Sequence, residues 1–157
     1  MSLRVEDVMV KEVITVKAGA PVREAVKLMN NHEIGCLVVV NRGKPVGIVT
    51  ERDMLKRVLA ESIDPGKINV SKIMSKPLVA GWSHMDLEDA ARLMFRKKIK
   101  KLPIVEGERL VGLVTLTDIA FAHVESKMVE VIKELSSSGW LPPRRMKKVI
   151  DFYVASV

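Results

Sequence analysis

The sequence has one cysteine, few aromatic residues and no long apolar segment. Cys36 has no partner for an intramolecular disulfide, and the apolar residues 37–40 that follow it favour burial of the thiol. Aromatic residues make up 4% of the chain, which leaves few rings to stack on nucleic-acid bases. No apolar run approaches the roughly 18 residues that cross a bilayer, and residues 1–6 lack a signal-peptide pattern. We therefore expect a soluble, cytoplasmic protein.

Motifs of catalysis are also missing. His32, His84 and His123 lie far apart, and none has a second ligand at a metal-like spacing, so we expect no metal site. No phosphate-binding P-loop, dinucleotide GxGxxG motif or nucleophile elbow is present. No general base, nucleophile and oxyanion donor converge in the sequence, so we predict a protein that is not an enzyme and has no catalytic residues.

Positive charge is in excess, with 26 Lys and Arg against 19 Asp and Glu and a net charge of +7. This balance favours an anionic ligand or surface but does not identify it. A nucleotide, a nucleic acid and an acidic protein stay open at this point.

What the chain does contain is an internal repeat. The heptad Gly47–Asp53 reads GIVTERD, and Gly112–Asp118, 65 positions later, reads GLVTLTD. Upstream of the heptads, further identities keep the same spacing without a gap: Met9, Lys11, Ala25, Leu28, Met29, Ile34, Leu37, Val40 and Val46 each match the residue 65 positions on. Two copies of one supersecondary unit are therefore expected.

Apolar periodicity predicts strand, helix, strand, strand, helix in each copy. A turn of helix at 5–9 or 70–74 precedes each copy. The first copy is predicted as strand 12–16, helix 21–31, antiparallel strands 34–40 and 46–49, and a helix capped by Thr50 that continues through Met54, Leu55, Val58 and Leu59. The second copy is predicted as strand 77–80, a helix with Leu87, Ala90, Ala91 and Met94 on one stripe, strands 101–105 and 110–114, and a helix opened by Thr115.

The predicted boundaries are 1–62 for the first copy, 66–135 for the second, and 136–157 for a linker and a C-terminal helix. That last helix carries one apolar stripe: Met146, Val149, Ile150, Tyr153 and Val154. Such a stripe is usually docked on its own domain or on a second subunit, so the helix is a candidate clamp of an oligomer.

Over roughly residues 3–125 the pattern resembles a tandem pair of CBS (cystathionine-beta-synthase-type) domains, known as a Bateman module. The resemblance rests on the two Gly-apolar-Val-Thr-x-x-Asp endings, the alanine-containing helices, and residues 101–105 (KLPIV). It implies an α+β fold of two β-α-β-β-α repeats, packed sheet to sheet with pseudo-twofold symmetry. It also implies two clefts that bind AMP, ADP, ATP or S-adenosylmethionine, and assembly into a homodimer.

Carried onto this sequence, the resemblance implies a main cleft and a second cleft. The main cleft would use Ile14, Ile34, Gly35, Lys100, Leu113, Thr115, Thr117 and Asp118. The second cleft would use Ile48, Thr50, Arg52, Asp53, Val79 and Ile99, with Lys100 nearby. Threonine hydroxyls and free amides at a helix start suit a phosphate, and a carboxylate in the first turn suits both ribose hydroxyls.

The main cleft ranks first. Both of its hydroxyl positions are threonine, and Gly35 leaves room for a ring. In the second cleft Arg52 replaces one hydroxyl residue, which either favours a longer phosphate chain or obstructs the site. Ala80-Gly81 also departs from Thr15-Val16 of the first copy.

Plainer interpretations remain for each feature. Asp53 and Asp118 also fit simple helix-start acids, and the run 96–101 (RKKIKK) also fits a solvated helix end. The leading hypothesis is a non-catalytic adenine-nucleotide sensor, involved in energy sensing, whose ligand changes a protein partner or an oligomer. The alternative is a basic nucleic-acid-binding or protein-docking module with vestigial clefts, since 144–148 (RRMKK) adds a second basic run.

Overall fold

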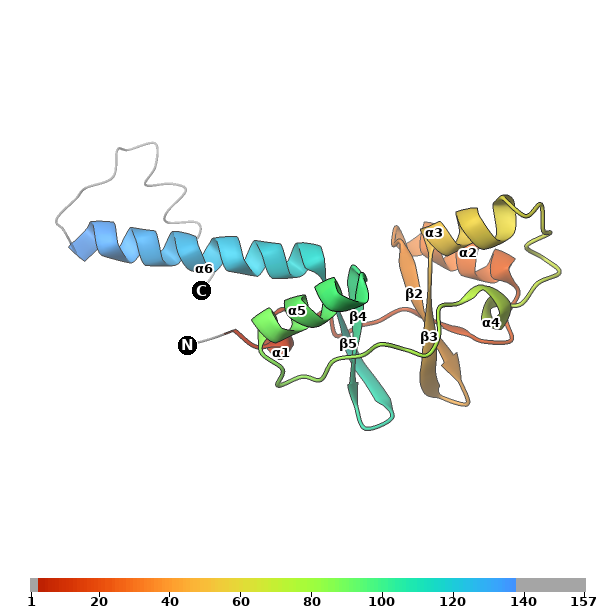
Figure 1. The fold of residues 1–157 in the computed structure, drawn as a ribbon, viewed down its shortest axis with the longest axis horizontal. Coiled ribbons are helices and arrows are strands. Elements are labelled where there is room, and N and C mark those ends of the chain that lie inside the picture. Colours follow the sequence, from red (N-terminus) through yellow and green to blue (C-terminus); the bar gives the residue numbers. More distant parts are fainter. Residues whose placement is uncertain (1–2, 138–157) are drawn as a thin grey trace. The chain divides into compact units, whose positions relative to one another are not determined.

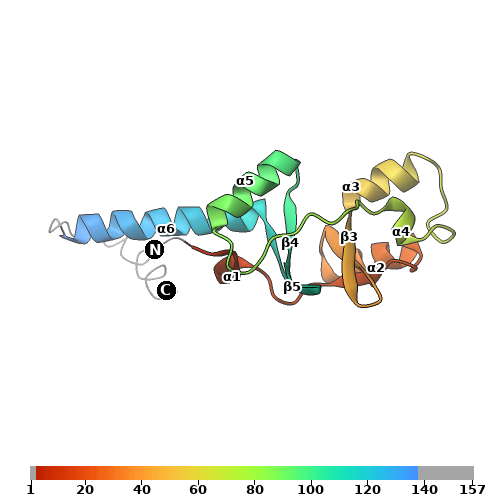
Figure 2. The same cartoon turned by 60° about the horizontal axis from the view of Figure 1, so that its bottom comes forward.

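The computed structural model describes residues 3–137, and the chain divides into two compact units, residues 1–115 and 116–157. Figures 1 and 2 show the elements of both units. The first unit contains all the strands found in residues 3–137, and the second begins with one long helix. The unit boundary therefore falls inside the second repeat, between Thr115 and Leu116.

Apart from one strand, the elements of the two repeats follow the predicted order. The first repeat comprises α1 (Val5–Val8), β1 (Thr15–Lys17), α2 (Val22–His32), β2 (Cys36–Asn41), β3 (Lys44–Thr50), α3 (Glu51–Met54) and the π-helix η1 (Leu55–Leu59). The second comprises α4 (Val70–Ile73), α5 (Leu87–Lys97), β4 (Lys101–Glu106), β5 (Arg109–Thr115) and α6 (Leu116–Ser137). The mixed α+β fold predicted from the sequence is confirmed.

One predicted strand is wrong. Residues 77–80, the expected counterpart of β1, form no strand, and only Gly81 makes a parallel bridge, to Ile104. A Cβ on Gly81 would stand 3.0 Å from Leu102 Cδ2 and 3.2 Å from Ile104 Cδ1, so a larger residue here would press on the ends of these two β4 side chains. Proline and small residues here have low strand propensity, unlike the β-branched Thr15-Val16 of β1.

The helices α2 and α5 show why the repeat folds twice in the same way. Each presents the same three offsets to the core: Val22, Ala25 and Met29 in α2, and Leu87, Ala90 and Met94 in α5. Each ends in a left-handed residue, Glu33 at φ 51° or Lys98 at φ 54°. A residue with positive φ ends the helical hydrogen bonding and turns the chain toward the next strand.

Three strands form the first sheet, in the order β1-β2-β3, with β1 parallel and β3 antiparallel to β2. The strands β4 and β5 form a separate antiparallel hairpin. Both hairpins carry a register shift at the same position, Val39/Val40 or Ile104/Val105. On one face of the first sheet, buried side chains of α2, η1 and α4 complete a core with Val16, Leu37, Val39 and Val49. Strands β3 and β5 contact each other, so the two sheets are neighbours.

Each repeat packs on the segment that leads into the other. We call residues 3–10 and 68–75 the lead-ins. The N–H of Val5 donates to Met85 O at 2.9 Å, and the N–H of Val70 donates to Ala20 O, also at 2.9 Å. The two bonds are equivalent, because Val70 and Met85 lie 65 positions after Val5 and Ala20. Two-way backbone pairs repeat the exchange: Val10 with Leu113, both at 2.9 Å, and Ser75 with Ile48, at 2.8 and 3.2 Å. This reciprocity is the pseudo-twofold relation of the repeats.

The exchanged lead-ins explain the glycine that opens each heptad. A Cβ on Gly47 would stand 2.8 Å from both Met74 Sδ and Ser75 O, closer than such contacts allow. A Cβ on Gly112 would likewise overlap Met9 Sδ. Glycine is needed at both positions because the opposite lead-in crosses there.

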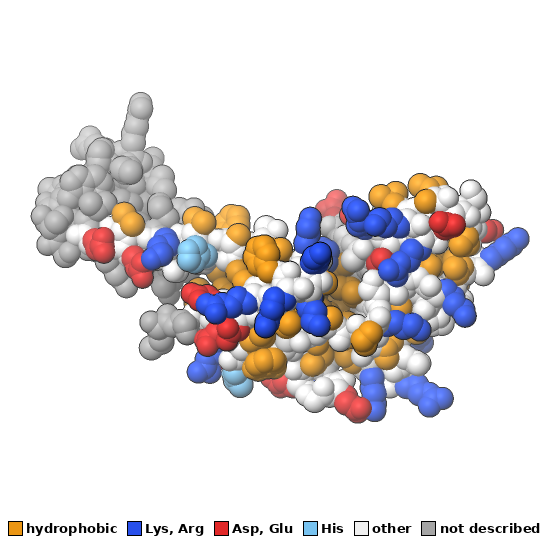
Figure 3. Space-filling model, viewed as in Figure 1, with side chains coloured by type: hydrophobic (Ala, Val, Ile, Leu, Met, Phe, Trp, Pro, Cys, Tyr) orange, Lys and Arg blue, Asp and Glu red, His pale blue; other side chains and the backbone are white. Residues whose placement is uncertain are grey.

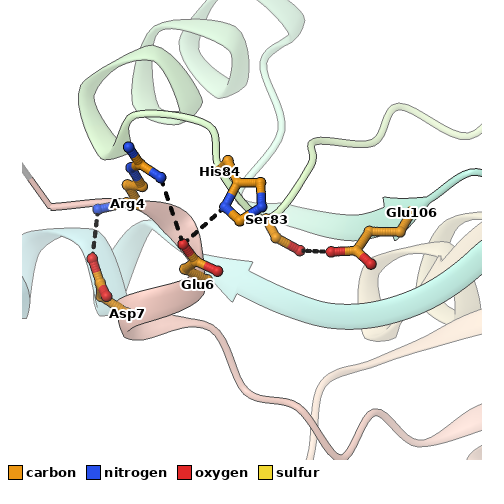
Figure 4. Close-up of polar contacts among 6 residues, drawn as sticks. All are labelled: Arg4, Glu6, Asp7, Ser83, His84 and Glu106. Atoms are coloured by element: carbon orange, nitrogen blue, oxygen red, sulfur yellow. Dashed lines mark hydrogen bonds and ion pairs between the residues drawn. The ribbon is translucent and has the colours of Figure 1, made fainter.

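Polar contacts reinforce one of the two junctions (Figure 4). Glu6 Oε1 lies 2.9 Å from His84 Nδ1 and 4.0 Å from Arg4 Nη1. The buried hydroxyl of Ser83 donates to Glu106 Oε1 at 2.6 Å. At the other junction Ala18 and Gly19 stand in place of Ser83 and His84. The two junctions therefore share their backbone bonds but differ in their side chains.

The second unit is described only as far as α6. This helix continues through Ser137, so it includes the first two residues of the predicted linker. The predicted C-terminal helix, with its stripe at Met146, Val149, Ile150, Tyr153 and Val154, lies outside the described residues.

Candidate functional site

The best-defined part of the second cleft is the junction of β3 and α3. Thr50 is the N-cap of α3, and its hydroxyl accepts from Asp53 N at 3.3 Å. The Asp53 carboxylate accepts in return from Thr50 N at 2.9 Å and from the Thr50 hydroxyl at 3.1 Å. This is a complete capping box, as the Thr-x-x-Asp spacing predicts.

A second partner occupies the other oxygen of Asp53. Arg57 Nη1 lies 3.6 Å from Asp53 Oδ1 and donates to Ile73 O at 2.5 Å. The Asp53 side chain is nearly buried, 13% exposed, and Arg57 joins it to the carbonyl end of α4. Asp53 therefore already has a structural role, and a ribose would have to compete with Arg57 for it.

The other residues assigned to the second cleft are spread over the first unit. Ile48, in β3, uses its backbone N–H and C=O to bond Ser75. Arg52 is exposed on α3, while Val79 and Ile99 are half-buried in the segments before α5 and β4. Among the six residues assigned to the second cleft, hydrogen bonds join Thr50 to Asp53.

The predicted main cleft draws on both units. Ile14, Ile34, Gly35, Lys100, Leu113 and Thr115 belong to the first unit, and Thr117 and Asp118 lie in the first turn of α6, in the second. Leu113 is half-buried and paired to Val10 through its backbone. Thr115 is the last residue of β5, as Thr50 is of β3, so the second heptad also changes from strand to helix after its threonine.

Glu51 was missed by the sequence reasoning. Its N–H donates to Gly35 O at 3.1 Å, and a Cβ on Gly35 would stand 3.1 Å from Glu51 Oε2. The space that Gly35 was expected to leave for a ring therefore holds a carboxylate. The signal was present in the hairpin register, because pairing of Cys36 with Thr50 places residues 35 and 51 opposite each other.

Cys36, next to this position, is buried in β2. Desolvation by burial raises the pKa of its thiol above the ordinary value of 9.0; Lys101 opposes the shift and Glu51 adds to it. A neutral buried thiol is a poor nucleophile, so Cys36 acts as a core side chain.

Cations gather at the C-terminal end of α5 and beyond it (Figure 3). Arg96, Lys97, Lys98 and Lys100 are all exposed, and within residues 3–137 none of them forms an ion pair. Positive charge at the carbonyl end of a helix is favourable in itself. The same four side chains also provide an attractive field for an anion.

The described residues contain neither a metal-ligand cluster nor a membrane-spanning helix. No three His, Cys, Asp or Glu side chains in residues 3–137 are grouped as metal ligands would be. Across the same part of the chain, no helix combines the length and apolarity needed to span a membrane.

Comparison with known proteins gives the family. The family model of the CBS domain matches the chain twice, over residues 5–60 and 70–125, and the chain belongs to the CBS-domain family. CBS domain-containing protein YhcV of Bacillus subtilis is 42% identical over 123 residues, which are 78% of this chain and 87% of the relative.

Two solved structures have the same fold. The CBS domain pair of protein MJ0100, solved with 5′-methylthioadenosine and S-adenosyl-L-methionine, is 29% identical with a TM-score of 0.73, over 80% of this chain and 99% of that one. A hexameric CBS-CP12 protein from bloom-forming cyanobacteria is also 29% identical, with a TM-score of 0.72, over 88% of this chain and 90% of that one.

Proposed function

We propose that the chain is a non-catalytic regulatory module that binds an adenosine-containing ligand between its two repeats. The observation that carries the proposal is the duplicated strand-to-helix turn, whose Thr50–Asp53 copy has a threonine cap and a nearly buried carboxylate. A similar CBS pair holds two adenosine compounds. The ligand would be AMP, ADP, ATP or S-adenosylmethionine.

The main cleft is the preferred site. Its ligand would be bound by Thr115, Thr117 and Asp118, with Lys100 toward the phosphates. The second cleft ranks lower because exposed Arg52 stands at the position that Thr117 has in the main cleft, 65 residues later. A ligand in the second cleft would also have to offset the loss of the Asp53–Arg57 ion pair.

Signalling would follow from the exchanged lead-ins. A ligand shifts a conformational equilibrium only by its differential affinity for the two states. Each lead-in precedes one repeat in the chain and packs on the other repeat. A change at one strand-to-helix turn would therefore reach both repeats.

A homodimer is the proposed assembly. In the first unit, Leu55, Leu59 and Phe95 are 58%, 71% and 72% exposed, on the outer side of η1 and α5. Leu55 and Leu59 lie four positions apart on one helix, so together they offer a small apolar surface that a second copy of the chain could cover. The hexameric relative shows that a similar CBS protein assembles.

The test is calorimetric titration of nucleotide-free protein with AMP, ADP, ATP and S-adenosylmethionine. We expect at least one to bind, and we expect Asp118→Ala to weaken it about tenfold or more, as loss of charge-assisted hydrogen bonds does. Asp53→Ala is the matched variant and should weaken binding less. Absence of binding by all four compounds would contradict the function, and equal small effects would contradict the site ranking.

A basic nucleic-acid-binding or protein-docking module is the second candidate, supported by exposed Phe95 between Arg92 and Arg96 on α5. Nucleic-acid affinity should fall steeply as salt rises. A cleft that recognises ribose and adenine should respond less, so the salt dependence of any binding separates the two candidates.

A further inference from the structure

A hollow of about 330 Å³ lies where the two hairpin turns of the first unit come together. Its polar lining consists of Lys11, Thr15 and Arg109, beside Gly43 of the β2–β3 turn. Thr50 and Thr115, the predicted nucleotide positions, stand at the opposite ends of β3 and β5. At about 3.3 Å per residue, those ends are about 20 Å from Gly43 and Arg109 along each strand. Val13 and Thr15 of the lining are the sequence neighbours of Ile14, so on that side the hollow adjoins a residue of the predicted main cleft.

The charge in this hollow is one-sided. Lys11 comes from the segment before β1, and Arg109 is the first residue of β5, so each repeat contributes one cation. Both side chains are exposed, and within residues 3–137 neither forms an ion pair. No Asp or Glu is among the lining residues. The rest of the lining is apolar: Val13, Val40 and Leu110.

The pseudo-twofold relation shows that this imbalance is specific to one side. Residues 65 positions apart are equivalent under this relation, so Arg109 corresponds to Lys44 and Glu108 corresponds to Gly43. On the equivalent side Lys44 Nζ forms an ion pair of 2.6 Å with Glu108 Oε2. On the side of the hollow, Gly43 has no carboxylate to offer Arg109, and a Cβ built on it would meet no atom within 4 Å.

We propose that this hollow is a further ligand site beside the two predicted clefts, specific for a small phosphate-bearing anion, with Arg109 and Lys11 binding the phosphate oxygens. The planar guanidinium can bind two oxygens at once, and Lys11 adds a point charge. The Thr15 hydroxyl is a further donor, and the apolar wall accepts the carbon part of a phosphate ester. A volume of this size is at the small end of ligand pockets, which suits a compact molecule rather than a polymer.

The test uses pyrophosphate as the probe and the full chain, free of nucleotide, in calorimetric titration. We expect saturable binding that falls about tenfold or more in Arg109→Gln and in Lys11→Gln. Arg109→Lys should retain part of the affinity. The matched controls are the pseudo-equivalent Lys44→Gln and Lys76→Gln, which should bind as the unaltered chain does.

A second pair of variants leaves both cations in place. Gly43→Asp puts a carboxylate near Arg109. Gly43→Asn adds a side chain of the same shape without the charge, and both substitutions place a residue other than glycine at the φ of 78° that Gly43 adopts. We expect Gly43→Asp to lose pyrophosphate binding and Gly43→Asn to keep it. Equal losses in the two variants would contradict the electrostatic argument.

The outcomes also separate this site from the nucleotide clefts. Lys100→Gln removes a cation assigned to those clefts and should leave pyrophosphate binding intact. No saturable pyrophosphate binding, or equal losses in Arg109→Gln and its control Lys44→Gln, would overturn the proposal. A loss in Lys100→Gln as large as that in Arg109→Gln would place the anion in the nucleotide cleft and overturn it as well.

Discussion

Gly47 provides the sharpest test of the exchanged lead-ins. The Gly47→Ala substitution adds one Cβ, which would stand 2.8 Å from Met74 Sδ and 2.8 Å from Ser75 O. The sulfur is part of a flexible side chain and can move. The carbonyl is backbone, held opposite β3 by the two hydrogen bonds between Ser75 and Ile48. Room for the methyl group therefore requires the lead-in itself to shift.

The expected cost follows from these contacts. Overpacking of a filled interior costs about 1–3 kcal/mol. Weakening the two Ser75–Ile48 hydrogen bonds adds about 0.5–1.5 kcal/mol each. Alanine has less conformational entropy than glycine in the unfolded chain, which offsets about 0.4–1 kcal/mol of this loss in stability. The net loss in free energy of unfolding should be about 1–6 kcal/mol, and a loss of about 3 kcal/mol lowers the Tm by about 10 °C for a domain of this size.

Thermal and denaturant unfolding measure this cost, with Gly19→Ala as the control. Gly19 has no atom within 4 Å of its added Cβ, so the same substitution there should be neutral or slightly stabilising. Gly112→Ala should cost less than Gly47→Ala, because its nearest contact is the movable Met9 side chain. If Gly47→Ala unfolds within about 0.5 kcal/mol of Gly19→Ala, which is the range of an ordinary surface change, the crossing described here is wrong.

Three further predictions concern single side chains. Asp53→Asn should lower stability by about 1–2 kcal/mol in denaturant unfolding, because it weakens the cap on Thr50 and the ion pair with Arg57; a smaller loss than in an exposed first-turn control, Asp89→Asn, would contradict this role. The raised pKa of Cys36 means that the unfolded chain releases its proton first, so stability should fall as pH rises above 9.0. Cys36→Val should remove that part of the alkaline decline, and an unchanged decline would refute it. Leu59→Glu should lower the mass measured by light scattering to that of a monomer, whereas an unchanged oligomer would place the interface elsewhere.

The repeat made most of the fold predictable. Because the offset of 65 positions has no gap, each element found in one copy located its counterpart, and the Val22 and Leu87 stripes lie in α2 and α5 as expected. The missing strand at 77–80 shows the limit of this reasoning. Similarity between copies does not carry over where Gly81 stands in place of the β-branched Val16 and pairs with β4 through a single bridge.

The lead-in exchange could not be predicted from the chain. Periodicity shows that Val70 and Ile73 are apolar, but not which repeat they cover, and both are buried in the core of the first repeat. The role of Arg57 was hidden for a similar reason, since its partner Ile73 is 16 positions away and bonds through a backbone oxygen. The capping box at Thr50 and Asp53 was predictable because both partners lie within one turn.

The lead-in exchange also changes what counts as one copy of the duplicated unit. A fragment cut at the repeat boundary, residues 1–62, would lack Val70 and Ile73 from its core and would carry α1 with nothing to cover. A fragment of residues 11–75 contains the complete first-repeat core instead. A protein with a single repeat and only the lead-in that precedes it would need the lead-in of a second molecule to complete that core. Duplication within one chain would thus convert an intermolecular exchange of lead-ins into an intramolecular one, because both lead-ins then belong to the same chain.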